Sequence, residues 1–296
     1  MRIADGFTVK NRRNLKPVED AYAFSGDGKA IVVADGITRD ARRTPVLRFP
    51  ENKLDVLGYL GAMRFFASYP KEGGNPARLV CSLFASDEWR EKTPEYVRKR
   101  VEDINQAVGR VNETTRRVQK WKEFDYLEHD IPGCVAAGAV EDNGRVSYFY
   151  IADCGIAILD RFGYEIFRTK NEGPNSRGSI DKDISEKFGE DFNHPGGRKR
   201  IRRDYRNNPE NQLSYGALTG EPEAMSYVRT GQVEARDGVF LIGYSDGLEG
   251  VIGINGFRKI LFEEAARRNF GVMNEKLRRL CQKQVSSEGT LVYMIR

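Results

Sequence analysis

The sequence of 296 residues contains only two histidines, His129 and His194. Histidine is thus the rarest of the residues that commonly bind metals or transfer protons. This scarcity argues against a zinc site built from several imidazoles. Four cysteines are present, without Cys-x-x-Cys spacing or grouping with histidine, which argues against a structural zinc and a redox dithiol. They are Cys81, Cys134, Cys154 and Cys281. We expect reduced thiols that pack as small hydrophobic groups.

Long apolar runs and nucleotide-binding motifs are also lacking. No stretch approaches the roughly 20 apolar residues that span a bilayer, and the first residues, MRIADGFTVKNRRN, have no apolar core of a signal peptide. We therefore expect a cytoplasmic protein without a membrane partner. Neither a P-loop nor a Gly-x-Gly-x-x-Gly motif is present, so nothing in the sequence supports nucleotide recognition.

The overall composition is that of a globular protein, with 40% hydrophobic and 31% charged residues. Lys and Arg exceed Asp and Glu by 48 to 43, and this mild excess is too dispersed to predict a nucleic-acid partner. The length favours a single domain over 1–296 with one polar insertion at about 171–212. That insertion contains the basic run 197–203, and we interpret it as solvated surface in preference to a substrate-facing flap.

Short apolar segments rich in β-branched and aromatic residues predict strands. They cover 30–34, 134–140, 146–152, 155–159, 239–244 and 290–295. Asn143-Gly144 predicts a hairpin turn, and the closely spaced strands from 134 to 167 predict an antiparallel meander. Helical periodicity appears at about 54–65, 94–122, 256–268 and 273–281, with Thr93 and Pro94 as a start signal. Grouped helices and strands predict an α+β fold.

Acidic residues recur at the ends of these strands. Asp35-Gly36 and Asp246-Gly247 each follow an apolar strand, and Asp153 follows another. Glu19-Asp20 and Glu288 precede further strands, so six acidic residues lie at strand margins. Converging carboxylates raise each other's pKa unless a cation neutralises them. An all-oxygen set without His or Cys favours Mg²⁺ or Mn²⁺, and two such ions can hold a phosphoryl group and lower the pKa of a shared water.

The order of these motifs resembles the metal-dependent Ser/Thr protein phosphatases of the PP2C type. The resemblance runs from about residue 13 to residue 292. The matching stretches are VEDAY at 18–22, VVADG at 32–36, GCVAA at 133–137, IADCG at 151–155, ALTG at 217–220, FLIGYSDGL at 240–248 and EGTLV at 288–292. This resemblance implies a four-layer αββα sandwich, in which helices flank two antiparallel sheets.

The resemblance also implies roles for single residues. Asp35 would bridge two divalent cations, Mn²⁺ or Mg²⁺, and the Gly36 carbonyl would ligate one of them. Asp246 would ligate the second cation, and Glu19 and Asp20 would contact the pair directly or through water. Asp153 would help to hold a third, weaker ion. Asp35 and Asp246 would then be the central residues of catalysis.

Three positions relate less directly to the family pattern. Ile37 stands where many members have a histidine after Asp-Gly, so protonation of the leaving group would fall to a metal-bound water or another side chain. Glu288 stands where the family has its last aspartate ligand, and it must serve with one extra methylene or the ligand is missing. The family's phosphate-binding arginine corresponds best to Arg13, with Arg12 and Lys16 as alternatives.

The leading hypothesis is a phosphatase that hydrolyses phosphoserine or phosphothreonine in a protein substrate by direct attack of a metal-bridging hydroxide. The alternative is a catalytically weak or inactive PP2C-like module that binds or regulates a phosphorylated partner. A third hypothesis keeps the enzyme but gives it a small phosphate ester or a nucleotide as substrate. The sequence names neither the physiological target nor the oligomeric state.

Overall fold

The computed structural model describes residues 3–11, 18–37, 75–86, 89–116, 131–174, 176, 178–189, 195–235 and 238–296. Within these ranges the chain forms two antiparallel sheets of five strands each. The first sheet has the order β1 (Ile3–Lys10), β10 (Glu288–Ile295), β9 (Phe240–Tyr244), β6 (Gly155–Leu159), β7 (Glu165–Arg168). The second has the order β2 (Ala21–Phe24), β3 (Ala30–Gly36), β4 (Cys134–Asp142), β5 (Arg145–Ile151), β8 (Arg229–Glu234).

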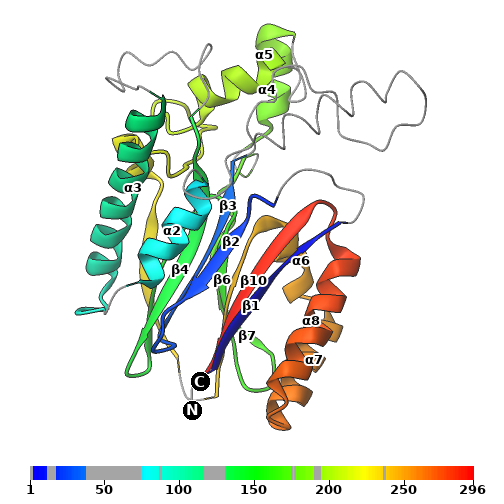
Figure 1. Ribbon diagram of the computed structural model, residues 1–296. Coiled ribbons are helices and arrows are strands. Elements are labelled where there is room, and N and C mark those ends of the chain that lie inside the picture. The colour runs from blue at the N-terminus through cyan, green and yellow to red at the C-terminus, as the bar shows by residue number, and fades with distance from the viewer. Residues whose placement is uncertain are drawn as a thin grey trace.

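Helices cover the outer face of each sheet, so the molecule has four layers (Figure 1). The second sheet carries α2 (Pro76–Ala85) and α3 (Pro94–Arg116), and the first carries α6 (Asp246–Ile252), α7 (Asn255–Ala266) and α8 (Phe270–Gln284). Asn75 caps the N-terminus of α2, where its side chain accepts a hydrogen bond from Ala77 N at 2.9 Å. Thr93 caps α3 in the same way and accepts a hydrogen bond from Tyr96 N at 3.3 Å. The predicted α+β sandwich is confirmed.

Two hydrophobic clusters hold these layers together. One lies between the sheets and extends under α2 and α3, and it includes Val33, Ile156 and Val292. The other lies between the first sheet and helices α6 to α8 and includes Leu261 and Leu277. The near-continuous apolar strands of the sequence are buried on both faces because each sheet has a neighbouring layer on either side. The four cysteines are reduced and buried, as expected.

The predicted antiparallel meander is wrong at its centre. β4 pairs with β5 and β6 pairs with β7, but β5 belongs to the second sheet and β6 to the first. The chain crosses between the sheets at Ala152, which has a left-handed φ of 61°. Because β6 pairs with β9 on its other side, it cannot continue the ladder of β5. Asp153 lies at this crossing.

Two of the predicted helices extend beyond the described residues. The stretch 54–65 lies entirely outside them, and of 94–122 the structure describes a helix up to Arg116. The C-terminal pair, α7 and α8, is confirmed. No helix within the described ranges is long and apolar enough to cross a membrane.

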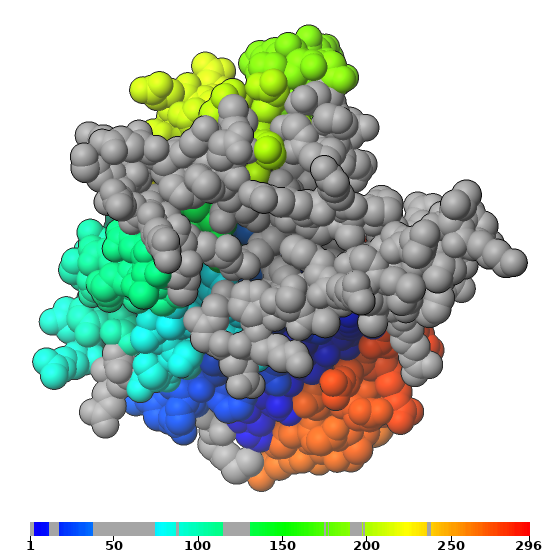
Figure 2. All heavy atoms as spheres, turned by 45° about the horizontal axis from the view of Figure 1, so that its top comes forward, coloured from blue at the N-terminus to red at the C-terminus, as the bar shows by residue number. Residues whose placement is uncertain are grey.

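The polar segment at about 171–212, predicted to be a solvated insertion, contains helices. It carries α4 (Ile180–Phe188), α5 (Pro195–Arg200) and a π-helical turn, Ile201–Tyr205. The side chains of Ile184 and Tyr205 are buried and join the cluster between the sheets. Figure 2 shows the green and yellow-green atoms of this segment at one end of the molecule and the orange helix pair at the opposite end. The insertion therefore packs on the sandwich instead of standing free of it.

Candidate metal centre

Strand pairing and sheet packing bring three carboxylates together. β2 and β3 pair with Ala21 opposite Ala34, so Asp20 before β2 lies beside Asp35 near the end of β3. Glu288 comes from the other sheet, as the first residue of β10. Asp20, Asp35 and Glu288 each offer one carboxylate oxygen, and these three oxygens lie within 4.8 Å of one another. The cluster thus joins both sheets at one end of the sandwich.

Asp20 is held by a buried hydroxyl. Its Oδ2 accepts a hydrogen bond of 2.7 Å from Ser245 Oγ, and Ser245 Oγ in turn accepts one of 2.9 Å from Thr290 N. Asp20 is 4% exposed, and its second oxygen, Oδ1, is buried without a hydrogen-bond partner. A buried carboxylate oxygen without a donor is costly. A cation is the kind of group that would satisfy it.

Glu19 contacts the cluster through its backbone. Its N–H donates to Glu288 at 3.1 Å from Oε2, which orients that carboxylate. Gly36 lies directly against this segment, since a Cβ at this position would stand 2.9 Å from the carbonyl oxygen of Glu19. The carboxylate of Glu19 is not one of the three that converge. The structure therefore shows a positioning role for the backbone of Glu19, and its predicted role as a metal ligand stays a prediction.

Asp246 and Asp153 lie near the cluster without joining it. Asp246 is the first residue of α6 and is exposed, whereas Asp153 lies between β5 and β6. The charge of Asp246 raises the pKa values of Asp20, Asp35 and Asp153, so all four carboxyl groups share one electrostatic environment. The predicted acidic residues thus gather at one end of the fold, in a tight group of three and a looser pair.

The pKa values of Asp20, Asp35, Asp153 and Glu288 are all raised. Burial, followed by the charges of Asp20 and Asp246, raises the pKa of Asp35 well above its usual range. Burial and the charge of Asp20 raise the pKa of Glu288 to about 8, and burial and the charge of Asp246 raise that of Asp153 to about 7. These four carboxyl groups resist ionisation chiefly because they are buried, and the like charges of their neighbours add to this effect.

These observations fit hard divalent cations. The donors are all oxygens, one buried oxygen lacks a partner, and the crowded negative charge needs compensation. Asp20, Asp35 and Glu288 could hold one ion. Asp246 and Asp153 are close enough for their charges to raise the pKa of Asp35. Glu288 reaches this group despite its extra methylene. The candidate phosphate ligand, Arg13, lies outside the described residues, as do Arg12 and Lys16.

Two residues that support the site were not singled out from the sequence. Ser245 positions Asp20, and its place before Asp246-Gly247, where a helix N-cap residue stands, was the available signal. Glu249, one turn into α6, accepts a 2.9 Å hydrogen bond from Asn171 Nδ2, and its charge raises the pKa of Asp153. No pattern in the sequence indicated that second contact, because it depends on how the loop after β7 folds over α6.

Protein-family models give no match to this sequence, and curated proteins give none either. Solved structures do match. The catalytic domain of the serine/threonine protein phosphatase PstP, in complex with two manganese ions, is 16% identical with a TM-score of 0.55, over 99% of this chain and 97% of that one. The serine/threonine phosphatase of S. agalactiae is 13% identical with a TM-score of 0.56, over 100% and 99%.

Stp1 of Staphylococcus aureus, also a serine/threonine phosphatase, is 14% identical with a TM-score of 0.53, over 100% of this chain and 95% of that one. These similarities extend over nearly the whole length of both chains, so they concern the complete sandwich and not one of its layers. Together with the two sheets and their flanking helices, they show that this chain has the fold of the PP2C-type serine/threonine phosphatases.

Proposed function

We propose that this protein is a metal-dependent phosphatase that hydrolyses phosphoserine or phosphothreonine in proteins. The observation that carries the proposal is the convergence of Asp20, Asp35 and Glu288 within 4.8 Å, with a buried oxygen of Asp20 left without a donor. The fold agrees with this chemistry, and the related PstP structure holds two manganese ions. The chain from 1 to 296 would act as one catalytic domain that carries the insertion.

Within this proposal, Asp35 belongs to the tight group, feels the charges of Asp246 and Asp153 and would be shared by two ions. Asp20 and Glu288 would complete one side and Asp246 the other, with Asp153 at a further position. Two Mn²⁺ or Mg²⁺ ions bound there would supply a deprotonated bridging water for direct attack on phosphorus and would neutralise the phosphoryl oxygens. The Gly36 carbonyl and the Glu19 carboxylate are further candidate ligands.

The protein itself orients the acidic groups. Ser245 fixes Asp20, and the backbone N–H of Glu19 fixes Glu288. Ile37 follows the metal-binding strand without offering an acid, and its N–H donates to Gly133 O at 3.0 Å. Ile37 therefore cannot protonate the leaving group, and this role would fall to a metal-bound water or to another side chain. Arg13 is proposed to bind the substrate phosphate, because a guanidinium can hold two phosphate oxygens at once.

The test is hydrolysis of p-nitrophenyl phosphate and of a phosphothreonine peptide in the presence of Mn²⁺. Asp35→Asn and Asp246→Asn should each lower kcat/KM by at least about a hundredfold, while the matched control Asp103→Asn, on the exposed face of α3, should leave it unchanged. Arg13→Ala should raise KM more than it lowers kcat. Mn²⁺ binding without hydrolysis of either substrate would support instead the inactive module that binds a phosphorylated partner.

A further inference from the structure

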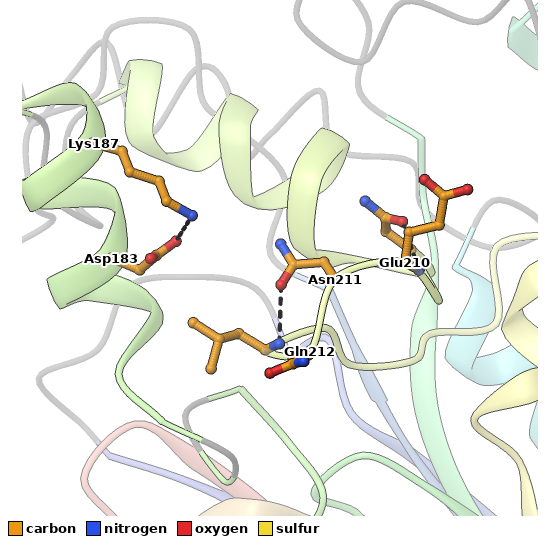
Figure 3. Close-up of a pocket in the computed structure, with 7 residues that line it drawn as sticks. Asp183, Lys187, Glu210, Asn211 and Gln212 are labelled. Atoms are coloured by element: carbon orange, nitrogen blue, oxygen red, sulfur yellow. Dashed lines mark hydrogen bonds and ion pairs between the residues drawn. The ribbon is translucent and has the colours of Figure 1, made fainter.

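A hollow of about 500 Å³ lies beside helix α4 (Figure 3). In Figure 1, α4 and α5 lie beyond one end of the two sheets. Helix α4 contributes Asp183 and Lys187 to its wall, and the loop after the π-helical turn contributes residues 208 and 210–213. Figure 3 shows the α4 side chains on one side and those of the loop on the other. The hollow is open to solvent and large enough for one long side chain.

The loop side of the hollow is held by hydrogen bonds between asparagine side chains and the backbone. The carbonyl oxygen of Asp204 accepts hydrogen bonds from Asn208 Nδ2 at 3.1 Å and Asn211 Nδ2 at 2.7 Å. The side-chain oxygens of the same two asparagines accept from Glu210 N at 3.2 Å and Leu213 N at 2.9 Å. Both asparagines are therefore committed to backbone partners, so the hollow is formed before any ligand arrives.

The remaining lining groups suit a cation on an apolar stem. The Asp183 carboxylate accepts hydrogen bonds from Lys187 Nζ at 2.8 Å and from the Tyr205 hydroxyl. The bond from Lys187, followed by that from Tyr205, lowers the pKa of Asp183, so this group stays ionised. Glu210 is exposed and adds a second carboxylate, and half-buried Leu213 adds apolar surface. Lysine and arginine side chains combine an aliphatic stem with such a charged end.

The hollow is connected to the candidate metal centre by a short, fixed stretch of chain. Leu213 is two residues from the buried Tyr215. Burial raises the pKa of Tyr215, the charge of Arg206 lowers it, and the charge of Asp153 adds to the rise, so Tyr215 lies within electrostatic reach of Asp153. Further along, Leu218 and Cys134 exchange backbone hydrogen bonds of 2.8 and 3.1 Å, and Cys134 pairs with Gly36. An extended peptide advances about 3.3 Å per residue. A few residues of a bound peptide would therefore connect the two places.

We propose that this hollow binds a lysine or arginine side chain of the phosphoprotein substrate, a few residues away from the phosphorylated side chain. The proposal rests on the proposed phosphatase function and names a substrate class for it. The incoming cation would lie between Asp183 and Glu210 and pack its stem on Leu213. Lys187 would move aside, since its ion pair with Asp183 is largely exposed, at 58% for Lys187, and such pairs are weak.

The experiment compares phosphoserine peptides that carry arginine, alanine or glutamate at each of the five positions before and after the phosphoserine. The readout is the ratio of kcat/KM for the arginine peptide to that for the alanine peptide, measured separately in each variant. In the wild type this ratio should reach about 5 at one or two positions, through KM, as expected for a pair worth about 1 kcal/mol.

The Glu210→Gln variant should bring the ratio close to 1, and Glu210→Lys should reverse the preference in favour of the glutamate peptide. Lys187→Ala should increase the ratio, because it removes the competing ammonium group. The matched control is Glu234→Gln, an exposed glutamate on β8, and it should keep the wild-type ratio. A wild-type ratio of 1 at every position, or a ratio that persists in both Glu210 variants, would overturn the proposal.

Peptide binding measured by calorimetry separates this inference from the proposed function. If the wild type hydrolyses neither p-nitrophenyl phosphate nor any peptide but still prefers arginine peptides through Glu210, the phosphatase function is wrong and the cation-binding hollow stands. If hydrolysis is normal and neither kinetics nor binding distinguishes arginine from alanine, the hollow is not a substrate subsite. Binding of the arginine peptide that is unchanged in Glu210→Lys would likewise exclude the hollow as a substrate subsite.

Discussion

The hydroxyl of Ser245 donates a 2.7 Å hydrogen bond to Oδ2 of Asp20, which links two residues 225 positions apart in the chain. The same hydroxyl accepts the N–H of Thr290 at 2.9 Å. One buried group therefore ties together the start of β2, the start of α6 and the start of β10. These are the three segments that supply Asp20, Asp246 and Glu288 to the candidate metal centre.

Replacing Ser245 by alanine should lower the free energy of unfolding by about 1–3 kcal/mol, because it leaves Asp20 Oδ2 and Thr290 N buried without their partner. Urea unfolding measures this. The control is Ser86→Ala, which removes an exposed hydroxyl bonded to Leu83 O and should change the value by no more than about 0.5 kcal/mol. Equal losses in the two variants would contradict the role assigned to Ser245.

Two glycines of α6 should respond in opposite directions to alanine. A Cβ at Gly247 would stand 2.0 Å from the carbonyl oxygen of Glu288, so Gly247→Ala should destabilise the protein by about 1–3 kcal/mol or more and weaken Mn²⁺ binding. A Cβ at Gly250 meets nothing within 4 Å, and alanine there should stabilise the helix by about 0.5–1 kcal/mol. Thermal unfolding with and without Mn²⁺ tests both, and a stabilising Gly247→Ala would refute the close approach.

Glu288→Gln should have opposite effects in the absence and presence of metal. Without metal, it removes one charge from a crowded acidic group whose pKa is raised to about 8, so the melting temperature at pH 8.5 should rise. Glutamine still offers an oxygen to Glu19 N, but Mn²⁺ affinity should fall by about 10–100-fold or more. Calorimetric titration and thermal unfolding measure these effects. A variant that keeps the wild-type Mn²⁺ affinity would show that Glu288 is not a ligand.

Stability should also depend on pH in a defined sense. Asp153 and Glu288 have pKa values of about 7 and 8 in the folded protein, against ordinary values of 3.8 and 4.5. Between those limits the folded state binds more protons than the unfolded state, so the free energy of unfolding of the metal-free protein should fall as pH rises from about 5 to 8. A rise over this range would contradict the shifts. Urea unfolding in EDTA measures the trend.

Mn²⁺ affinity should change with pH in the opposite sense. Protons and metal ions compete for the same carboxylates, so affinity should increase as pH rises through the pKa values of about 7 and 8. Calorimetric titration at pH 6, 7 and 8.5 gives the slope. The Glu288→Gln variant serves as the comparison, since it lacks one of the competing protons and should show a shallower dependence. A pH-independent affinity in the wild type would contradict the proposed ligand set.

The central strands were predictable because their side chains are buried on both faces. The runs at 30–34 and 155–159 are almost continuously apolar, and β3 and β6 lie inside the two sheets. The strands β1 and β8 were not predicted, because they lie at sheet edges and carry polar residues along much of their length, as in IADGFTVK and RTGQVE. The crossing at Ala152 was also missed, since close spacing alone resembles a continuous meander.

Local periodicity and composition were sufficient to predict the strand ends at which acidic residues stand and the α+β class. They were not sufficient to predict which carboxylates meet. Asp20, Asp35 and Glu288 converge, whereas Asp246 stays exposed beside them. That outcome depends on the packing of one sheet against the other and on the Ser245 bridge, because contacts between residues so distant in the chain leave no local pattern.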